Sequence, residues 1–271
     1  MNATASRTTD RSGAPIAPTP RRIAVRSTTK LIVAEAKLFV REPLGAFFGI
    51  AFPAILLLVL GSAMPGFDEP SADIGGRRPV EAYVPVVLAL AIGTVALVNL
   101  LNTLATNRER GILRRLSTTP VPPVRLLVAQ LVVNVVALVV GAALAVLGAW
   151  AGFGIDLSPN LAGLLLAFVL GSASMVTLAV LVAAFTPTNR AAVAVGSLIY
   201  YPLLFAAGVW TPGPLMPEGV RRVADFTPLG AASQALQDAW AGDWPQPLHL
   251  AVLTGFTVGF GALATRLFRW T

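Results

Sequence analysis

The chain has 271 residues, of which 55% are apolar and 12% charged, and its mean hydropathy is +0.74. Soluble domains carry about a quarter charged residues, so this composition excludes an ordinary soluble protein and predicts one polytopic, all-α membrane domain. The chain has no cysteine, which excludes disulfides, thiolate metal sites and cysteine nucleophiles. The net charge of +7 is compatible with nucleic-acid binding, but its distribution along the chain gives another explanation.

The N-terminal 41 residues divide into two parts. Residues 1–25 are polar and rich in Pro, Ser and Thr, which is typical of a disordered tail. Residues 26–41 mix apolar and charged side chains, which predicts an amphipathic helix lying on the inner leaflet. The charged side chains of this helix include Lys30, Glu35, Lys37 and Arg41. Glu42-Pro43 should end it, so we expect a cytoplasmic tail over 1–25 and a membrane domain over 26–271.

Six apolar runs are long enough to cross a bilayer core, which takes about 20 residues. They cover approximately residues 44–64, 83–105, 126–150, 161–185, 191–210 and 248–267. An even number places both termini on one side, and sixteen of the twenty Lys and Arg residues lie there. The positive-inside rule makes this side cytoplasmic. We therefore expect six transmembrane helices, and lipid headgroups rather than nucleic acid as the partner of the basic charge.

The charged segment between the second and third runs, residues 106–124, is the most informative part of the chain. Thr106 and Glu109 have the spacing of a capping box, which predicts that a short helix begins at Thr106. Its apolar stripe would consist of Ile112, Leu113 and Leu116, with Arg110, Arg114 and Arg115 off the stripe. Pro120 would end it. Such a helix is suited to docking on another protein, although an ordinary positive-inside loop has the same pattern.

The segment between the fifth and sixth runs, residues 211–247, is long and only partly polar. Pro217 can start one helix, and residues 230–240 offer a second. The apolar face of the first would consist of Val220, Val223, Ala224 and Phe226. Trp240 and Trp244 suit the outer membrane interface. Two short re-entrant helices that cap a pathway and an interfacial hairpin that only packs both fit this pattern.

The apolar runs lack the chemistry of several protein classes. None has an ionisable residue in its central part, which disfavours a proton- or ion-coupled carrier. There is no G-x-x-x-x-G-K-[ST] phosphate loop, and His249 is the single histidine. We therefore expect that this chain does not hydrolyse ATP, hold a metal ion or carry out acid–base catalysis. We also expect that it binds no cofactor. If the protein moves a substrate uphill, the energy source lies on another subunit.

Uncharged polar side chains do occur in the runs. Hydrogen bonding between helices accounts for most of them. The second and fifth runs nevertheless combine apolar area with a few hydrogen-bonding groups, which suits a pathway for an amphipathic substrate. The candidate lining residues are Asn99, Tyr200, Tyr201 and Phe205. Packing alone is the competing interpretation for each of them.

Three motifs carry a resemblance to a known family. They are Glu109-Arg110-Gly111 through Leu116 with Thr119-Pro120-Val121; Tyr201-Pro202, Phe205, Gly208, Pro212 and Met216-Pro217; and Thr227-Pro228-Leu229. Together with the hydropathy pattern they resemble the permease subunit of type-2 ATP-binding-cassette exporters, particularly the daunorubicin-resistance-type drug exporters of actinobacteria. The resemblance covers about residues 26–271. The third motif departs from the family, which usually has Asn-Pro at the position of Thr227-Pro228.

The resemblance implies a mechanism and a set of partners. In this family the segment corresponding to Glu109, Arg110, Gly111, Leu113, Arg114, Arg115 and Leu116 is a coupling helix that sits in a cleft of a separate ATPase subunit. ATP and Mg bind to that subunit, and substrate passes between two permeases, here a second copy of the chain or a paralogue. The implied role is export of an amphipathic drug-like or lipid-like substrate across a bacterial inner membrane, with antibiotic transport and drug resistance as its context. A secondary carrier, a membrane enzyme and a structural partner remain the alternatives.

Overall fold

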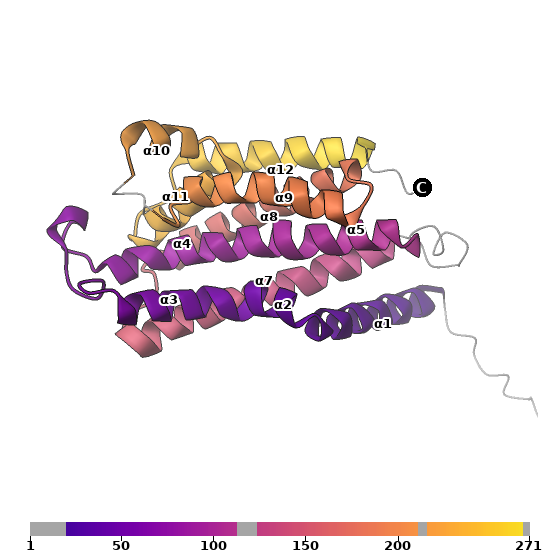
Figure 1. Cartoon of the computed structure of the whole chain (residues 1–271), viewed down its shortest axis with the longest axis horizontal. Coiled ribbons are helices and arrows are strands. Elements are labelled where there is room, and N and C mark those ends of the chain that lie inside the picture. The colour runs from indigo at the N-terminus through magenta and orange to yellow at the C-terminus, as the bar shows by residue number, and fades with distance from the viewer. Residues whose placement is uncertain (1–19, 113–123, 211–215, 268–271) are drawn as a thin grey trace, which may run out of the picture.

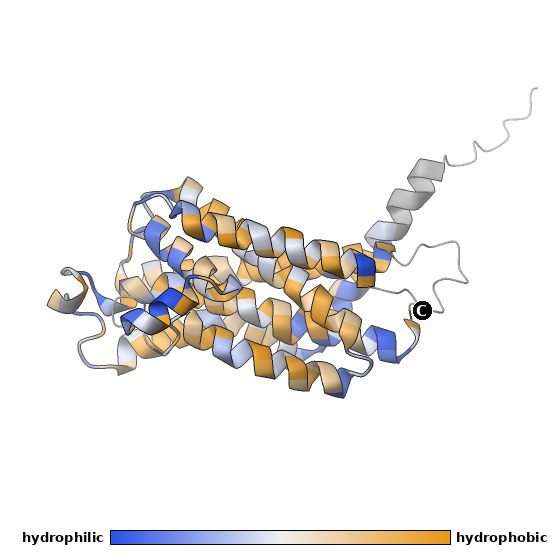
Figure 2. Ribbon diagram, turned by 90° about the horizontal axis from the view of Figure 1, so that it is seen from above, coloured by the Kyte–Doolittle hydropathy of each residue, from blue (hydrophilic) through white to orange (hydrophobic). Residues whose placement is uncertain are grey.

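The structure, a computed structural model, describes residues 20–112, 124–210 and 216–267. The described part of the chain is helical and contains no strand. Its long helices run side by side in an elongated bundle, with α1 at one end and α10 at the other (Figure 1). The apolar residues cover the bodies of the helices, and the hydrophilic residues gather toward the two ends (Figure 2). We call the end with α1 and the last turn of α12 the basic end, and the other the α10 end.

Five helices in the described ranges are long and apolar enough to cross a membrane: Pro43–Ala63, Pro79–Glu109, Val124–Phe153, Leu161–Phe185 and Pro247–Leu267. The first is made of α2 (Pro43–Ala46), η1 (Phe47–Ala51) and α3 (Phe52–Ala63), and the second of α4 (Pro79–Gly93), η3 (Thr94–Leu100) and α5 (Leu101–Glu109). The other three are α7, α8 and α12. They correspond to the first four expected spans and the sixth.

The remaining expected span, residues 191–210, corresponds to α9, Asn189–Ala206, which is not among those five helices. It has 18 residues and begins with the polar pair Asn189 and Arg190. It ends four residues earlier than the apolar run because Gly208 takes a φ of 83°, a left-handed conformation that stops a helix. Figure 1 shows α9 within the bundle, alongside the other long helices.

The second span is the core of the bundle. It is almost entirely buried, whereas at most 39% of any of the other four candidate spans is buried. Other helices of the chain surround it, so nearly all of its side chains are packed against protein. The close approach of its neighbours depends on glycine: a Cβ added at Gly141 of α7 would lie 2.7 Å from the carbonyl oxygen of Gly49.

Two π-helical turns face each other in the first and second spans. They are η1 in the first span and η3 in the second, and they are in contact. Asn99 of η3 is 6% exposed, and its Nδ2 donates a hydrogen bond of 3.0 Å to the carbonyl of Gly45. A π turn leaves backbone groups out of the regular α-helical pattern, and such turns are frequent at functional sites.

The helix α1, Pro20–Arg41, extends the expected amphipathic helix toward the N-terminus and contacts α7. Residues 20–25 are therefore helical rather than part of a disordered tail. The rest of the expected tail, residues 1–19, lies outside the described residues. As expected, α1 ends before Glu42, and Pro43 begins the next helix.

The segment before α12 forms two short helices, as the sequence predicts. α10 covers Glu218–Ala224 after Pro217, and α11 covers Pro228–Trp240. The predicted apolar face of the first helix is divided, since Ala224 is buried while Val223 and Phe226 are 67% and 61% exposed. α11 is buried against α4, α8 and α12, and so packs as part of the bundle. Of the two tryptophans, Trp240 is buried and Trp244 exposed.

Thr227 connects these two helices. Its hydroxyl donates to the carbonyl of Ala224 at 2.8 Å and accepts the N–H of Gly230 at 3.1 Å. It therefore closes the end of α10 and caps the start of α11, where threonine is among the favoured residues. This capping role gives a structural reason for a threonine at position 227.

Candidate functional site

The second span ends in a turn at the basic end. α5 continues the span without a break, and Thr106 lies inside it, where its carbonyl accepts the N–H of Arg110 at 3.0 Å. The prediction that a separate helix begins at Thr106 is therefore wrong, because the helix of the preceding apolar run extends past this residue and leaves no helix start to cap. The span ends at Glu109, and Gly111, two residues later, has a φ of 64°, the left-handed conformation typical just past a helix C-terminus.

Only some of the residues expected to form a coupling helix lie in the part of the chain that the structure describes. Glu109, Arg110 and Gly111 lie in it, and the first two are exposed. Leu113, Arg114, Arg115 and Leu116 lie outside the described residues. The described part thus shows the route by which the chain enters the segment 113–123.

Glu109 connects this turn to the start of α9. Its Oε2 accepts a hydrogen bond of 2.7 Å from the backbone N–H of Asn189, the first residue of α9. A carboxylate is favourable there because the first N–H groups of a helix lack partners within the helix and carry a partial positive charge. The hydroxyl of Thr188 caps the same helix end by accepting the N–H of Ala191. Glu109 therefore caps α9 rather than its own helix.

Arg108 binds the other side of the same turn. Its Nη1 donates to the carbonyls of Ala183 and Ala184, at 3.0 Å and 2.8 Å, in the last turn of α8, Leu161–Phe185. A cation is favourable at a helix C-terminus, where carbonyls lack intrahelical partners. Sequence reasoning missed Arg108 and Asn189. The signal for Arg108 was present, since it is the first basic residue after a long apolar run.

The expected pathway residues do not all share one face. Tyr201 and Phe205, one helical turn apart on α9, are 60% and 46% exposed, and Leu198 on the same face is 76% exposed. Asn99, by contrast, is buried in the contact between the first and second spans through its bond to Gly45. The structure brings Tyr201 and Phe205 together and separates Asn99 from them.

Tyr200 lies between these groups. Its hydroxyl is 2.6 Å from Oγ1 of Thr94 in the second span, and the Thr94 hydroxyl itself donates to the carbonyl of Leu90 at 2.7 Å. Because a threonine hydroxyl has a single proton, Tyr200 is the donor to Thr94. The Tyr200 and Tyr201 rings are 5.7 Å apart, and both border a small hollow of about 150 Å³. Tyr200 thus ties α9 to the core, while Tyr201 faces outward.

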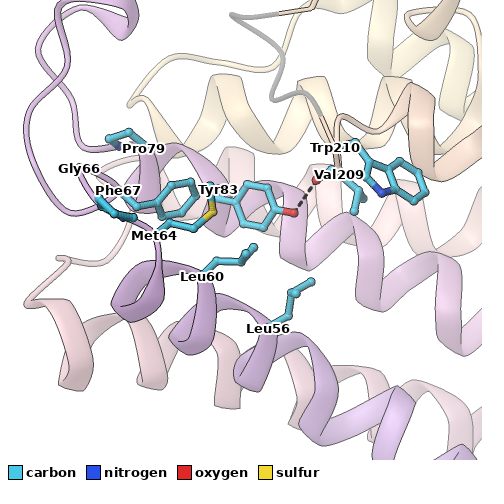
Figure 3. A pocket seen from close by; sticks show the side chains of 10 residues that line it. Leu56, Leu60, Met64, Gly66, Phe67, Pro79, Tyr83, Val209 and Trp210 are labelled. Atoms are coloured by element: carbon cyan, nitrogen blue, oxygen red, sulfur yellow. Dashed lines mark hydrogen bonds between the residues drawn. The ribbon is translucent and has the colours of Figure 1, made fainter.

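An apolar pocket of about 620 Å³ opens at the α10 end, between the first span, the second span and the end of α9. Figure 3 shows its lining, in which the hydroxyl of Tyr83 points to the carbonyl of Val209. That hydrogen bond is 2.6 Å long, and the Phe67 and Tyr83 rings pack 5.8 Å apart. The lining otherwise consists mainly of apolar side chains, including Leu56, Leu60 and Trp210. The pocket therefore suits a hydrocarbon body.

The end of α9 is held by hydrogen bonds from two other helices. Tyr83 of α4 donates to the carbonyl of Val209, and Ser233 of α11 donates to that of Ala207 at 2.7 Å. The unwound residues after α9 thus have their carbonyls satisfied by protein although they lie beside apolar helices, as a membrane setting requires.

His249 lies near the start of α12 and is 3% exposed. Its Nε2 is 3.4 Å from Oδ1 of Asp225, and its Nδ1 is 3.5 Å from Oδ2 of Asp238. These contacts join α11 and α12 and the residue that follows α10. The described residues contain no group of three or more His, Cys, Asp or Glu arranged to hold a metal ion.

A comparison with models of protein families identifies the family of this chain. The model of the ABC-2 type transporter family matches residues 27–239, from α1 through nearly all of α11. No curated protein matches the chain. The matched segment includes the turn at Glu109, the whole of α9 and α10, and nearly all of α11. The family domain and the apolar helices identify a multi-pass membrane protein, and the chain belongs to the ABC-2 type transporter family.

Proposed function

We propose that the chain is the permease subunit of an ABC exporter, driven by a separate ATP-hydrolysing subunit, that moves an amphipathic drug-like or lipid-like substrate out of the cell. ABC-2 permeases work with a nucleotide-binding subunit, and the ABC-2 domain is the membrane component rather than the ATPase. The observation that carries the proposal is the turn at residues 108–111, from which the second span holds both α8 and α9.

The topology in this proposal has six spans, with α9 as the fifth and both termini in the cytoplasm. The 18 residues of α9 rise about 27 Å, close to the thickness of the hydrocarbon core. Its polar start lies at the basic end, beside the end of the second span. The concentration of Lys and Arg at that end supports a cytoplasmic position in a bacterial inner membrane.

Coupling starts, in this proposal, where an ATPase subunit contacts Glu109, Arg110 and the segment 113–116. Displacement of the turn would act on α8 through Arg108 and on α9 through Glu109. Gly111 forms the hinge between α5 and that segment, since its left-handed conformation sets the direction in which the chain leaves the span. The residues thus link a docking segment directly to the helix that carries Tyr201.

The pathway follows the exposed face of α9, where Tyr201 and Phe205 would meet a second permease, either another copy or a paralogue. The apolar pocket beside Trp210 continues this face toward the α10 end. A mixture of apolar area with a few hydroxyls suits an amphipathic molecule without fixed ionic partners. Asn99 is left out of the lining because it is bonded within the chain.

The test uses the permease expressed with its ATPase subunit. We expect Phe205→Ala and Tyr201→Ala to change the substrate concentration that half-maximally stimulates ATPase activity, while basal activity and the amount of complex stay near wild type. Phe185→Ala, at an exposed phenylalanine at the end of α8, is the matched control. If the complex does not form, or if stimulation by substrate is the same in all variants, the proposal is wrong.

A further inference from the structure

A polar cavity of about 260 Å³ lies at the basic end, bordered by residues of α1, α5 and α7 and by Asn189 at the start of α9. It is separate from the exposed face of α9 and from the apolar pocket at the α10 end. The amphipathic helix α1 borders it with the apolar side chains of Leu38 and Phe39 and with the carboxylate of Glu35, and Glu42 follows this helix. The cavity therefore lies where a polar headgroup and a hydrocarbon chain would separate.

Among the described residues, three buried amide oxygens around this cavity have no hydrogen-bond partner. They are Oδ1 of Asn102, Oδ1 of Asn134 and Oδ1 of Asn189. Gln130 and Asn134 are 2% and 4% exposed and lie one turn apart on α7. Buried polar groups are normally paired, so three unpaired oxygens around one cavity are placed to accept hydrogen bonds from a polar ligand.

The unpaired atoms define what that ligand must offer. All three are amide oxygens, which accept hydrogen bonds. The orientation of Asn134 is fixed, since its Nδ2 donates to the carbonyl of Gln130 at 2.9 Å, and its Oδ1 has no partner among the described residues. The cavity thus requires a ligand that mainly donates hydrogen bonds.

The charges around the cavity favour a cation. Glu35 and Glu42 contribute two carboxylates, and Arg110 contributes one guanidinium. Burial raises the pKa of Glu35, the amide of Gln130 opposes this rise, and the neighbouring Glu42 carboxylate adds to it. A carboxylate in these surroundings is stabilised by a cation placed beside it.

We propose that this cavity binds the ammonium group of an amphipathic primary amine, with its N–H groups on Glu35 and the amide oxygens of Asn134 and Asn102. The hydrocarbon part would lie against Leu38, Phe39 and Val133. The role of the cavity as a substrate-access site at the inner leaflet rests on the proposed exporter function. The ammonium can belong to a transported amine or to an aminophospholipid headgroup.

Binding is measured on the full-length permease in nanodiscs of phosphatidylcholine, with dodecylamine as the probe. We expect saturable binding of dodecylamine, and binding about tenfold weaker or more for dodecyltrimethylammonium, which has the charge but no N–H donor. We expect a similar loss for Glu35→Gln and Asn134→Leu. Glu69→Gln, at an exposed carboxylate near the other end, should bind like wild type.

Folding is monitored separately through thermal unfolding. Asn134→Leu removes an unpaired buried oxygen, so its melting temperature should equal or exceed that of wild type while binding is lost. Equal binding of both amines, equal binding by wild type and Glu35→Gln, or no binding to wild type would each overturn the proposal. Because no ATPase subunit is present, failure here is distinguishable from failure of the exporter function.

The source of the ammonium is settled by competition. Nanodiscs that contain phosphatidylethanolamine should weaken dodecylamine binding if the headgroup occupies the cavity. An unchanged affinity assigns the cavity to a transported amine, and Glu35→Gln should then lower ATP-dependent dodecylamine efflux in the complex with the ATPase. Both results keep the site and differ only in its occupant.

Discussion

The Glu109 carboxylate lies 2.7 Å from the backbone nitrogen of Asn189, across 80 residues of sequence. One residue earlier, Arg108 binds the last carbonyls of α8. Two adjacent residues of opposite charge thus hold the two ends of the turn between α8 and α9, the anion at a helix start and the cation at a helix end. This arrangement complements both helix dipoles and attaches the turn to the end of the second span.

The first prediction tests the contact from Glu109. Glu109→Gln keeps a hydrogen-bond acceptor but loses the charge, and Glu109→Ala loses both. We expect transport by the complex to fall in that order, with the variants still inserted in the membrane. The lost cap should destabilise the permease by about 1 kcal/mol, which is too small to unfold it.

The measurement for Glu109 is substrate efflux and ATPase activity at equal amounts of complex. Glu218→Ala is the control, since Glu218 forms an exposed ion pair with Arg222 within α10 and such pairs contribute little. Wild-type efflux in Glu109→Ala would show that the contact does not contribute to coupling.

The second prediction concerns the conformation of Gly111. A Cβ added there would meet no atom of the described residues within 4 Å, so we expect the effect of substitution to be conformational rather than steric. We expect Gly111→Ala to cost about 1 kcal/mol and Gly111→Asn less, because asparagine tolerates φ near +60°. Gly111→Pro should abolish transport, since proline cannot adopt a positive φ.

Efflux and melting temperature should follow the order Gly, Asn, Ala, Pro. A Pro variant that transports like wild type would contradict a hinge at this residue, and equal values for Ala and Asn would contradict the conformational explanation.

The sequence was informative where a single pattern decides the structure. Apolar runs predicted five of the long helices to within a few residues, because burial in a membrane requires continuous apolar helix. Pro217 correctly marked the start of α10. The local sequence pattern was insufficient at Thr106. The capping pattern there occurs inside the helix that continues from the preceding apolar run.

The sequence could not predict which residues from distant segments would form hydrogen bonds with each other in the site. Nothing local indicates that Glu109 caps α9, or that Asn99 bonds to Gly45, because both contacts join segments more than 50 residues apart. The end of α9 also depends on Tyr83 and Ser233 from other helices. Local propensity cannot supply such partners, and long-range packing decides them.

The third prediction concerns the pH dependence of stability through Glu35. Its pKa is raised above the model-peptide value of 4.5, chiefly by burial, while Glu42 and Arg110 are the charged groups beside the same cavity. A raised pKa in the folded protein means that the protonated carboxyl is favoured, so this contribution to stability is present below pH 4.5 and is lost as the pH rises through the raised pKa.

We therefore expect Glu35→Gln to flatten the melting temperature between pH 4.5 and 7 and to raise it at pH 7 relative to wild type. The measurement is thermal unfolding in detergent across this range. Glu69→Gln, at an exposed carboxylate for which no such burial applies, should keep the wild-type profile. A Glu35→Gln profile parallel to wild type would contradict the assignment.

The last prediction concerns the number of spans and therefore the role of α9. The chain has no cysteine, so single cysteines can be placed at Ser12, Ser71 and Thr271 without a background. If α9 crosses the membrane, the two terminal positions lie together on the cytoplasmic side and Ser71→Cys alone is labelled by an impermeant thiol reagent in intact cells. If α9 does not cross, an odd number of spans places Ser12 and Thr271 on opposite sides, and one terminal position is labelled in intact cells. Labelling of all three after permeabilisation is the control for reactivity. A labelled Ser12→Cys together with a protected Ser71→Cys would instead invert the whole orientation, and with it the placement of the Glu109 turn on the side where ATP is available.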